Sequence, residues 1–149
     1  MSKQAMVMKS GQGQPLNVLG AQVRFLCESE STGNAWSLME VRLPRDSGPP
    51  PHDHPWDEAY YVTEGDVRFT LGTDTVTVSA GDFVYAPAGT LHAFCGASDE
   101  PARVLIFDAP AHAGSFFREL DREVKELPRD LAKVPEIGNR HAVRFLLPA

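Results

Sequence analysis

Two histidines and a glutamate close together in the sequence have a spacing suited to binding a metal ion. His52 and His54 are separated by one residue, and Glu58 follows four residues after His54. Side chains two residues apart in an extended segment point to the same side, so we expect the two imidazoles to share a face. A bend at Pro55-Trp56 can bring Glu58 back onto that face. This segment therefore predicts three ligands at one site.

A second segment supplies a further histidine, His92. The residues Pro87-Ala-Gly89 precede it and are typical of a tight turn, which we expect to lead into a strand carrying His92. Three imidazoles and one carboxylate suit a single divalent transition metal ion such as Fe, Mn, Ni or Zn. They leave a +2 ion with a net charge of about +1 and, if it is octahedral, about two open positions. The alternative is a solvated Pro-rich loop beside a surface acid.

Length and charge limit the classes of function. The 149 residues suggest one domain, residues 1–149. The 14 basic and 20 acidic residues give a net charge of −6, which disfavours nucleic acid and anionic membranes as partners. Two cysteines are too few for a disulfide scaffold. The apolar run near the N-terminus is shorter than a signal peptide requires, so we expect a cytoplasmic protein.

Short runs rich in Val, Phe, Tyr and Thr alternate with Gly and Pro, which predicts an all-β sandwich or barrel. Val67, Phe69 and Leu71 share one face, as in a half-buried antiparallel strand, and Val76 and Val78 alternate in the same way. The apolar run at 104–107 does not alternate, which predicts a strand covered on both sides. The expected strands are 23–28, 35–43, 58–63, 66–71, 75–79, 82–85, 91–95 and 103–108.

The pattern changes after Pro110. Apolar residues recur at steps of four, four and three, which predicts an amphipathic helix that Pro128 ends. A second helical stretch is expected at about 130–140, interrupted at Pro135, and residues 142–147 can close as a strand or a tail. We place the C-terminal helical tail at about 113–141. The first helix is marked by Phe116, Leu120, Val124 and Leu127.

The two metal-ligand segments together resemble the two motifs of the cupin superfamily. Its first motif has Gly, His-x-His, Glu and Gly, and here six residues separate Glu58 from Gly65. Its second motif has Gly, Pro-x-Gly, His and Asn. The spacing of fifteen residues between the motifs is similar to that of small microbial cupins. The residues in register with the second motif are Gly81, Pro87, Gly89 and His92.

Two positions depart from the family pattern, and neither is a metal ligand in it. Three residues rather than five separate Gly48 from His52, and Gly96 stands where the family has Asn. The resemblance implies a double-stranded β-helix (a jelly-roll or cupin barrel) over about 23–108, with a C-terminal helical extension. It also implies that the ligands project into the mouth of the barrel. The segment from Asp108 to Glu119 is similar to small cupins of the quercetin-dioxygenase-like type.

Aromatic residues near the ligands are candidates for binding a substrate. Tyr60 has the parity of Glu58 along its strand, and Phe94 has that of His92. Phe83 or Tyr85 can also point inward. Such walls suit a flat or apolar organic ligand, although each residue taken singly can simply fill the barrel. We therefore predict these four residues as substrate-binding.

The leading hypothesis is a metal-dependent enzyme, a dioxygenase acting on a small oxygen-rich substrate such as a flavonol, catechol or diketone. Glu58 would be a metal ligand and, if it swings off the metal, the catalytic base. One alternative is a metal-dependent isomerase or decarboxylase of a small sugar or keto-acid. That reaction favours a cationic anchor inside the barrel, but the parity of the strand arginines mostly places them outside. A non-enzymatic small-molecule binder is the third hypothesis. We also expect a homodimer that protects the sheet edges.

Overall fold

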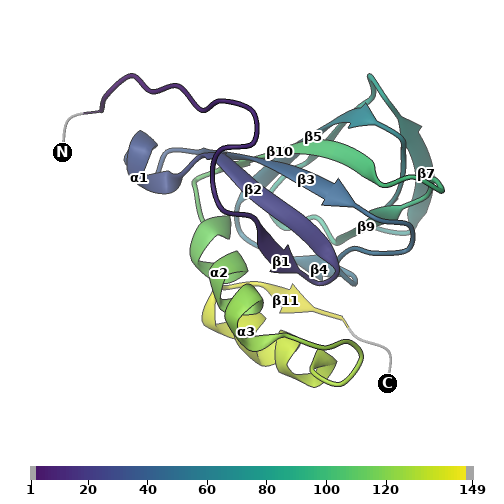
Figure 1. Cartoon of the computed structure of the whole chain (residues 1–149). Coiled ribbons are helices and arrows are strands. Elements are labelled where there is room, and N and C mark those ends of the chain that lie inside the picture. Colours follow the sequence, from purple (N-terminus) through teal and green to yellow (C-terminus); the bar gives the residue numbers. More distant parts are fainter. Residues whose placement is uncertain (1–2, 147–149) are drawn as a thin grey trace.

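The computed structural model describes residues 3–146 and consists mainly of β-strands (Figure 1). All eight expected strands are present, with their bounds shifted by at most two residues. The fold class predicted from the sequence is confirmed. The strands that match the predictions are β2 (Ala21–Cys27), β3 (Ser37–Leu43), β5 (Asp57–Glu64), β6 (Asp66–Leu71), β7 (Asp74–Ser79), β8 (Phe83–Ala86), β9 (His92–Gly96) and β10 (Ala102–Ala109).

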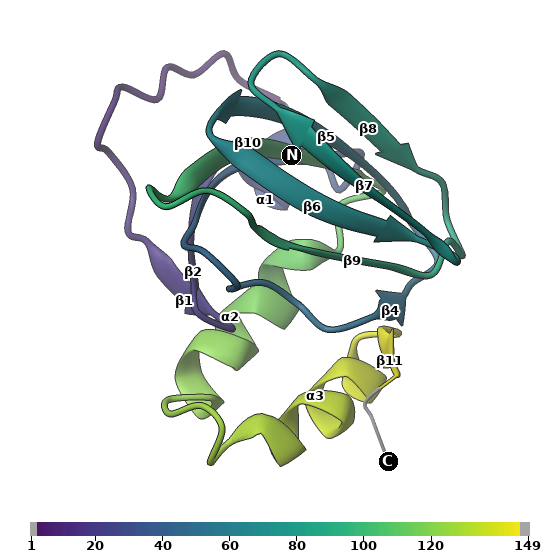
Figure 2. The same ribbon diagram turned by 90° about the vertical axis from the view of Figure 1, so that its right-hand side faces the viewer.

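The strands form two antiparallel sheets that face each other as a double-stranded β-helix (Figure 2). The larger sheet has the order β1-β2-β3-β10-β5-β8, and the smaller has the order β11-β4-β9-β6-β7. Four short elements were not predicted: β1 (Leu16–Val18), α1 (Ser29–Thr32), β4 (His52–Asp53) and, as a defined strand, β11 (Arg144–Phe145). The sheets enclose a space whose mouth is covered by the C-terminal helices.

Strand periodicity places the core between the sheets. In β6, Val67 and Phe69 are fully buried and Arg68 is exposed, as predicted. The prediction that residues 104–107 are covered on both sides is wrong for the single chain, because Phe107 is 38% exposed on the outer face of its sheet. Val76 also departs from its predicted alternation, because β7 is the last strand of the smaller sheet and leaves it 44% exposed.

The C-terminal part forms helices where they were expected, with two corrections. Helix α2 (Ala113–Glu123) ends before Pro128, because Val124 already has an extended backbone. Pro135 lies in the first turn of α3 (Val134–Arg140), so it begins this helix instead of interrupting it. A short 3-10 turn, Leu131–Lys133, precedes α3. The expected apolar end of this segment at Leu147 lies outside the described residues.

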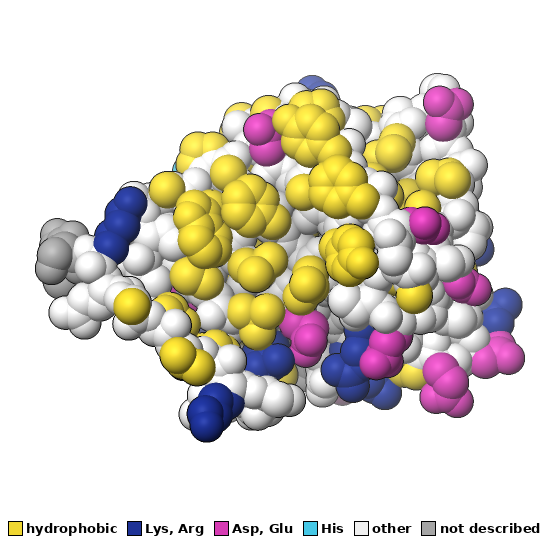
Figure 3. Space-filling model, turned by 90° about the horizontal axis from the view of Figure 1, so that it is seen from above, with side chains coloured by type: hydrophobic (Ala, Val, Ile, Leu, Met, Phe, Trp, Pro, Cys, Tyr) yellow, Lys and Arg dark blue, Asp and Glu magenta, His cyan; other side chains and the backbone are white. Residues whose placement is uncertain are grey.

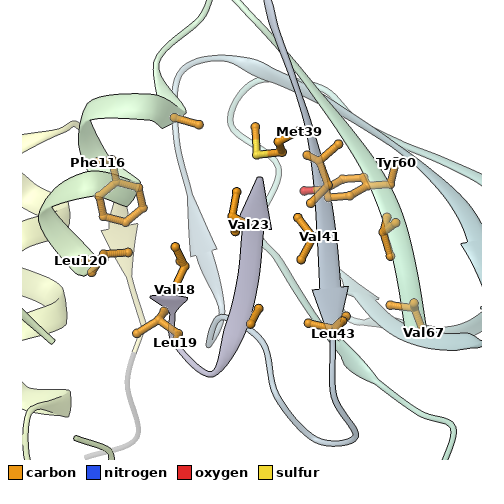
Figure 4. Packing of buried hydrophobic residues seen from close by; sticks show 14 of the residues in the cluster. Val18, Leu19, Val23, Met39, Val41, Leu43, Tyr60, Val67, Phe116 and Leu120 are labelled. Carbon is orange, nitrogen blue, oxygen red and sulfur yellow. The ribbon is translucent and has the colours of Figure 1, made fainter. Parts of the chain in front are cut away.

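The hydrophobic core joins the barrel to the C-terminal helices. Figure 4 shows Phe116 and Leu120 of α2 pointing toward Val18 and Val23 of the barrel. Phe116 is 5% exposed and Leu120 is 1% exposed, so this face of α2 is part of the protein interior. Within residues 3–146, no helix combines the length and the hydrophobicity needed to cross a bilayer.

Candidate metal centre

The three predicted histidines meet at the mouth of the barrel. His52 lies in β4 and pairs directly with His92 of the neighbouring strand β9. His54 follows β4, and one ring nitrogen from each histidine lies within 4.8 Å of the others. Glu58, in β5, has Oε1 at 2.9 Å from Nε2 of His54 and Oε2 at 3.9 Å from Nε2 of His92. The structure therefore brings all four predicted ligands together.

The predicted turn before His92 connects the two ligand-bearing segments. Thr90 donates its backbone N–H to the carbonyl of Pro87 at 3.1 Å, and Gly89 has a φ of 84°. This geometry needs a residue that tolerates positive φ. The Gly89 N–H then donates to the backbone carbonyl of His54 at 2.9 Å. The turn thus fixes the distance between His54 and the strand that carries His92.

Gly48 holds the other end of the first ligand segment against β9. Its φ is +150°, and a Cβ atom at this position would lie 1.9 Å from the carbonyl oxygen of Phe94. Only glycine permits this close approach of the two backbones. The proline loop that leads to His52 is therefore fixed against the strand of His92, despite the shorter spacing after Gly48.

Hydrogen bonds define which nitrogen of each histidine faces the centre. Nδ1 of His52 contacts the carbonyl of Pro50 at 2.8 Å, and Nδ1 of His92 contacts that of Thr90 at 2.7 Å. Nδ1 of His54 contacts the carbonyl of Trp56 at 3.1 Å. A carbonyl only accepts hydrogen bonds, so each Nδ1 is the protonated donor. Each neutral imidazole then carries its free electron pair on Nε2.

Two of these Nε2 atoms are buried and lack a hydrogen-bond partner among residues 3–146. They belong to His54 and His92. The carboxylate of Glu58 is close to His54, but the two groups are not oriented for a hydrogen bond. Unpaired buried polar atoms cost free energy, and a divalent ion bound by these nitrogens would satisfy them. The residues present therefore fit a divalent transition metal.

The ionisation of the cluster suits a cation. Burial, assisted by the neighbouring His92, lowers the pKa of His52 to about 4. Burial also lowers the pKa of His92. Burial alone would raise the pKa of Glu58, but the adjacent His54, together with His92 and the hydrogen bond from Tyr60, holds it at about 2. At neutral pH the site combines the neutral imidazoles of His52 and His92 with the carboxylate of Glu58.

Comparison with known proteins agrees with this geometry. Residues 39–108 match the family described as Cupin domain. An uncharacterized protein of Streptomyces coelicolor is 33% identical over 91 residues, which cover 61% of this chain and 82% of that protein. The chain belongs to the cupin superfamily. The quercetin-dioxygenase-like subtype expected from the sequence stays a prediction, because these matches do not reach that level.

Two solved structures show how widely this fold is used. A predicted oxalate decarboxylase from Thermotoga maritima has a TM-score of 0.64 at 23% identity, with 70% of this chain and 98% of that chain covered. The polyketide cyclase RemF from Streptomyces resistomycificus has a TM-score of 0.60 at 22% identity, with 74% and 80% covered. These likenesses show the cupin fold, and the fold alone does not select a reaction.

Two aromatic residues hold the carboxylate of Glu58 in this cupin. Trp56 donates its indole N–H to Oε1 at 3.3 Å, and the Tyr60 hydroxyl donates to Oε2. Burial and the adjacent carboxylate raise the pKa of Tyr60 well above its usual value, so this phenol remains a donor. Trp56 also stacks on His54, with ring centroids 4.0 Å apart and planes 7° apart.

The role of Trp56 was missed from the sequence, which indicated packing or an interface. Its position two residues before Glu58 places both side chains on the same side, and this parity was an available signal. Tyr60 is buried as expected, but it contacts Glu58 and is not among the residues that line the cavity.

The histidine cluster opens onto an apolar cavity. Of the four predicted substrate-binding residues, one lines this cavity and three do not. Phe94 lines the cavity, as expected. The expectation that Phe83 or Tyr85 points inward is wrong, because they are 63% and 53% exposed. In β8 the inward positions belong to Val84 and Ala86. Parity was ambiguous here because apolar residues occupy both sides of this strand.

Proposed function

We propose that this cupin is a metal-dependent enzyme, a dioxygenase that acts on a small oxygen-rich organic substrate of the flavonol, catechol or diketone type. The observation that carries the proposal is the orientation of the three imidazoles, whose Nδ1 atoms are held by backbone carbonyls and whose Nε2 atoms face one another. These backbone hydrogen bonds hold the three rings in place, as a precise metal site requires.

The ligand set supports catalysis because it leaves coordination positions open. His52, His54 and His92 with Glu58 supply four donors, fewer than the six of an octahedral ion. A divalent transition metal bound there would act as a Lewis acid, which makes the hydroxyl of a bound substrate easier to deprotonate, and as a centre for O2 chemistry. The apolar surroundings exclude water and strengthen these electrostatic effects.

The state of Glu58 favours the role of ligand over that of base in the resting site. A carboxylate with a pKa of about 2 remains charged at neutral pH but accepts a proton weakly. Both of its oxygens also receive hydrogen bonds, from Trp56 and Tyr60. For Glu58 to act as the base, it has to leave these partners, which would raise its pKa.

The isomerase or decarboxylase alternative receives less support from the site. A sugar phosphate or keto-acid needs a cationic anchor, and no Lys or Arg lines the described cavity. Arg24 forms an ion pair with Glu40 at 3.1 Å, and Arg42, Arg68 and Arg103 are exposed. A non-enzymatic binder would share the metal site, so only turnover separates it from an enzyme.

The first test is elemental analysis of the purified protein. We expect about one transition metal ion per chain, and far less in the His52→Ala, His54→Ala double variant. His141→Ala is the matched control, because His141 contacts Glu119 away from the cluster, and it should retain the metal. A protein that holds no metal after reconstitution with Fe, Mn, Ni and Zn would overturn the proposal.

Oxygen uptake then separates an enzyme from a binder. The metal-loaded protein is given flavonols, catechols and diketones in a closed cell with an oxygen electrode. Consumption of O2 that the double variant lacks is the expected result. Metal binding without O2 consumption on any of these substrates would contradict the dioxygenase assignment.

A further inference from the structure

Helix α2 forms one wall of the cavity beside the metal cluster. The helix lies across the mouth of the barrel (Figure 2), and Phe116, Phe117 and Leu120 line the cavity together with Phe145 of β11. The opposite wall comes from the barrel and includes His52, His54 and Glu58. A molecule bound at the metal cluster therefore touches the C-terminal part of the chain.

Hydrogen bonds fix α2 to the barrel at both ends. At its start, the fully buried carboxylate of Asp108 accepts the backbone N–H groups of His112 and Ala113 at 2.9 and 3.0 Å. Toward its end, Asp121 accepts the N–H of Asn17 in β1 at 2.8 Å. The position of this wall is therefore determined by the barrel itself.

The chemistry of the lining restricts what can bind. The polar residues among the described lining are His52, His54 and Glu58, and the others are apolar. Moving a charged group into such a place without a partner costs free energy. Apart from the metal ion itself, a carboxylate or phosphate would meet Glu58 and no Lys or Arg among the described lining residues. The cavity therefore favours a neutral molecule whose polar atoms lie at the histidine end.

The size of the cavity adds a second restriction. Its free volume is about 40 Å3, enough for roughly three water molecules. A ligand that carries a ring has to displace side chains from the wall. Among the wall residues on α2, Phe117 is half-buried, whereas Phe116 and Leu120 are buried, so Phe117 is the residue of this helix with room to rotate toward solvent.

We propose that α2 determines the substrate class of this site, and that Phe117 is its specificity-determining residue. The substrate is a neutral organic molecule with an apolar ring that packs against Phe117 and oxygen atoms that face the imidazoles. This inference rests on the proposed function, since it concerns the ligand of the same site.

The test measures binding to metal-free protein, so that it does not depend on turnover. Trp56 lines the cavity and is one of two tryptophans, so a Trp36→Phe background leaves it as the sole indole fluorophore. We expect naphthalene-2,3-diol to quench this fluorescence at concentrations at which naphthalene-2-carboxylate does not. Equal or tighter binding of the carboxylate would overturn the preference for a neutral ligand.

Shortening the wall residue tests its role in specificity. In Phe117→Ala, the preference for naphthalene-2,3-diol over catechol should rise about tenfold, because the second ring occupies the vacated space. Phe83→Ala, an equal truncation on the outer face, should leave the ratio unchanged. An unchanged ratio in Phe117→Ala would contradict the proposal. Absence of metal would overturn the proposed function alone, because these binding measurements use no metal.

The outside of the larger sheet carries exposed aromatic residues that lie apart from the cavity. Figure 3 shows hydrophobic side chains gathered on the face seen from above. Phe107 of β10 and Tyr85 of β8 lie in one row on either side of Ala59, and Phe83, which is 63% exposed, is not among the residues that line the cavity. Phe83→Ala therefore shortens a side chain outside the cavity, and a change of the binding ratio in this control would contradict a specific role for Phe117.

Discussion

The barrel and the C-terminal segment contribute to the same site in different ways. The barrel supplies the groups that can bind a metal, since His52 and His92 lie opposite each other on neighbouring strands. The C-terminal segment supplies apolar surface, through Phe116 and Phe117 of α2 and Phe145 of β11. The chemistry and the choice of ligand therefore reside in separate parts of the chain. Substitutions in one part should leave the contribution of the other intact.

The largest effect is expected from removing two metal ligands. The His52→Ala, His54→Ala double variant should lose the metal almost completely, because two of the three imidazoles are absent. The barrel should retain its strands, since these ligands lie at its mouth. Metal content and circular dichroism measure the two effects together. Retention of the metal by this variant would show that the ion binds elsewhere.

Shortening a buried residue of α2 should instead lower the stability of the fold and leave metal binding unchanged. Leu120→Ala removes a side chain that is 1% exposed, which costs about 2–5 kcal/mol of the free energy of unfolding. The number of metal ions bound per folded chain should not change. Urea unfolding and elemental analysis measure these quantities. If Leu120→Ala abolished metal binding in folded protein, the division between the two parts would be wrong.

Acid should destabilise the metal-free barrel through its histidines. The pKa of His52 is about 4 in the folded protein and 6.5 in the unfolded chain. The unfolded state therefore binds more protons, and stability falls as the pH drops below 6.5. His52 alone should account for a loss of about 2 kcal/mol at pH 5. In urea unfolding measured between pH 7 and 5, the free energy of unfolding should fall less steeply with decreasing pH in His52→Gln than in the wild type. An equal pH dependence in both proteins would contradict this prediction.

The smallest effect is expected from the residue that holds Glu58. Tyr60→Phe removes the hydroxyl that donates to the carboxylate, which should weaken metal affinity about tenfold while one ion still binds per chain. Competition with a fluorescent chelator measures this affinity. Tyr61→Phe changes the neighbouring residue on the outer face and should have no effect. Equal losses in both variants would exclude a specific role for Tyr60.

The barrel and its ligands were predictable because local patterns determine them. Alternation placed Val67 and Phe69 in the core, and the spacing of His52, His54 and Glu58 placed three ligands on one side. Residue types also identified the turn at Gly89. The same reasoning failed for Phe83 and Tyr85, because a strand with apolar residues on both sides has no parity signal.

The wall of the cavity was not predictable, because it depends on long-range packing. The sequence indicated an amphipathic α2 but not the surface that its apolar side covers. Its placement depends on contacts such as that between Asn17 and Asp121, which are 104 residues apart. Trp56 is a different case, because its parity with Glu58, two residues away, is a local signal for the contact that its indole makes.

The most direct test of the metal centre is the protonation state of its histidines. Long-range 15N–1H correlation NMR of the zinc-loaded protein distinguishes Nδ1 from Nε2 in each of the five histidines. We predict that His52, His54 and His92 carry a proton on Nδ1 and bind zinc through Nε2. Protons on Nε2 of these three residues, or ring signals that zinc leaves unchanged, would contradict the account.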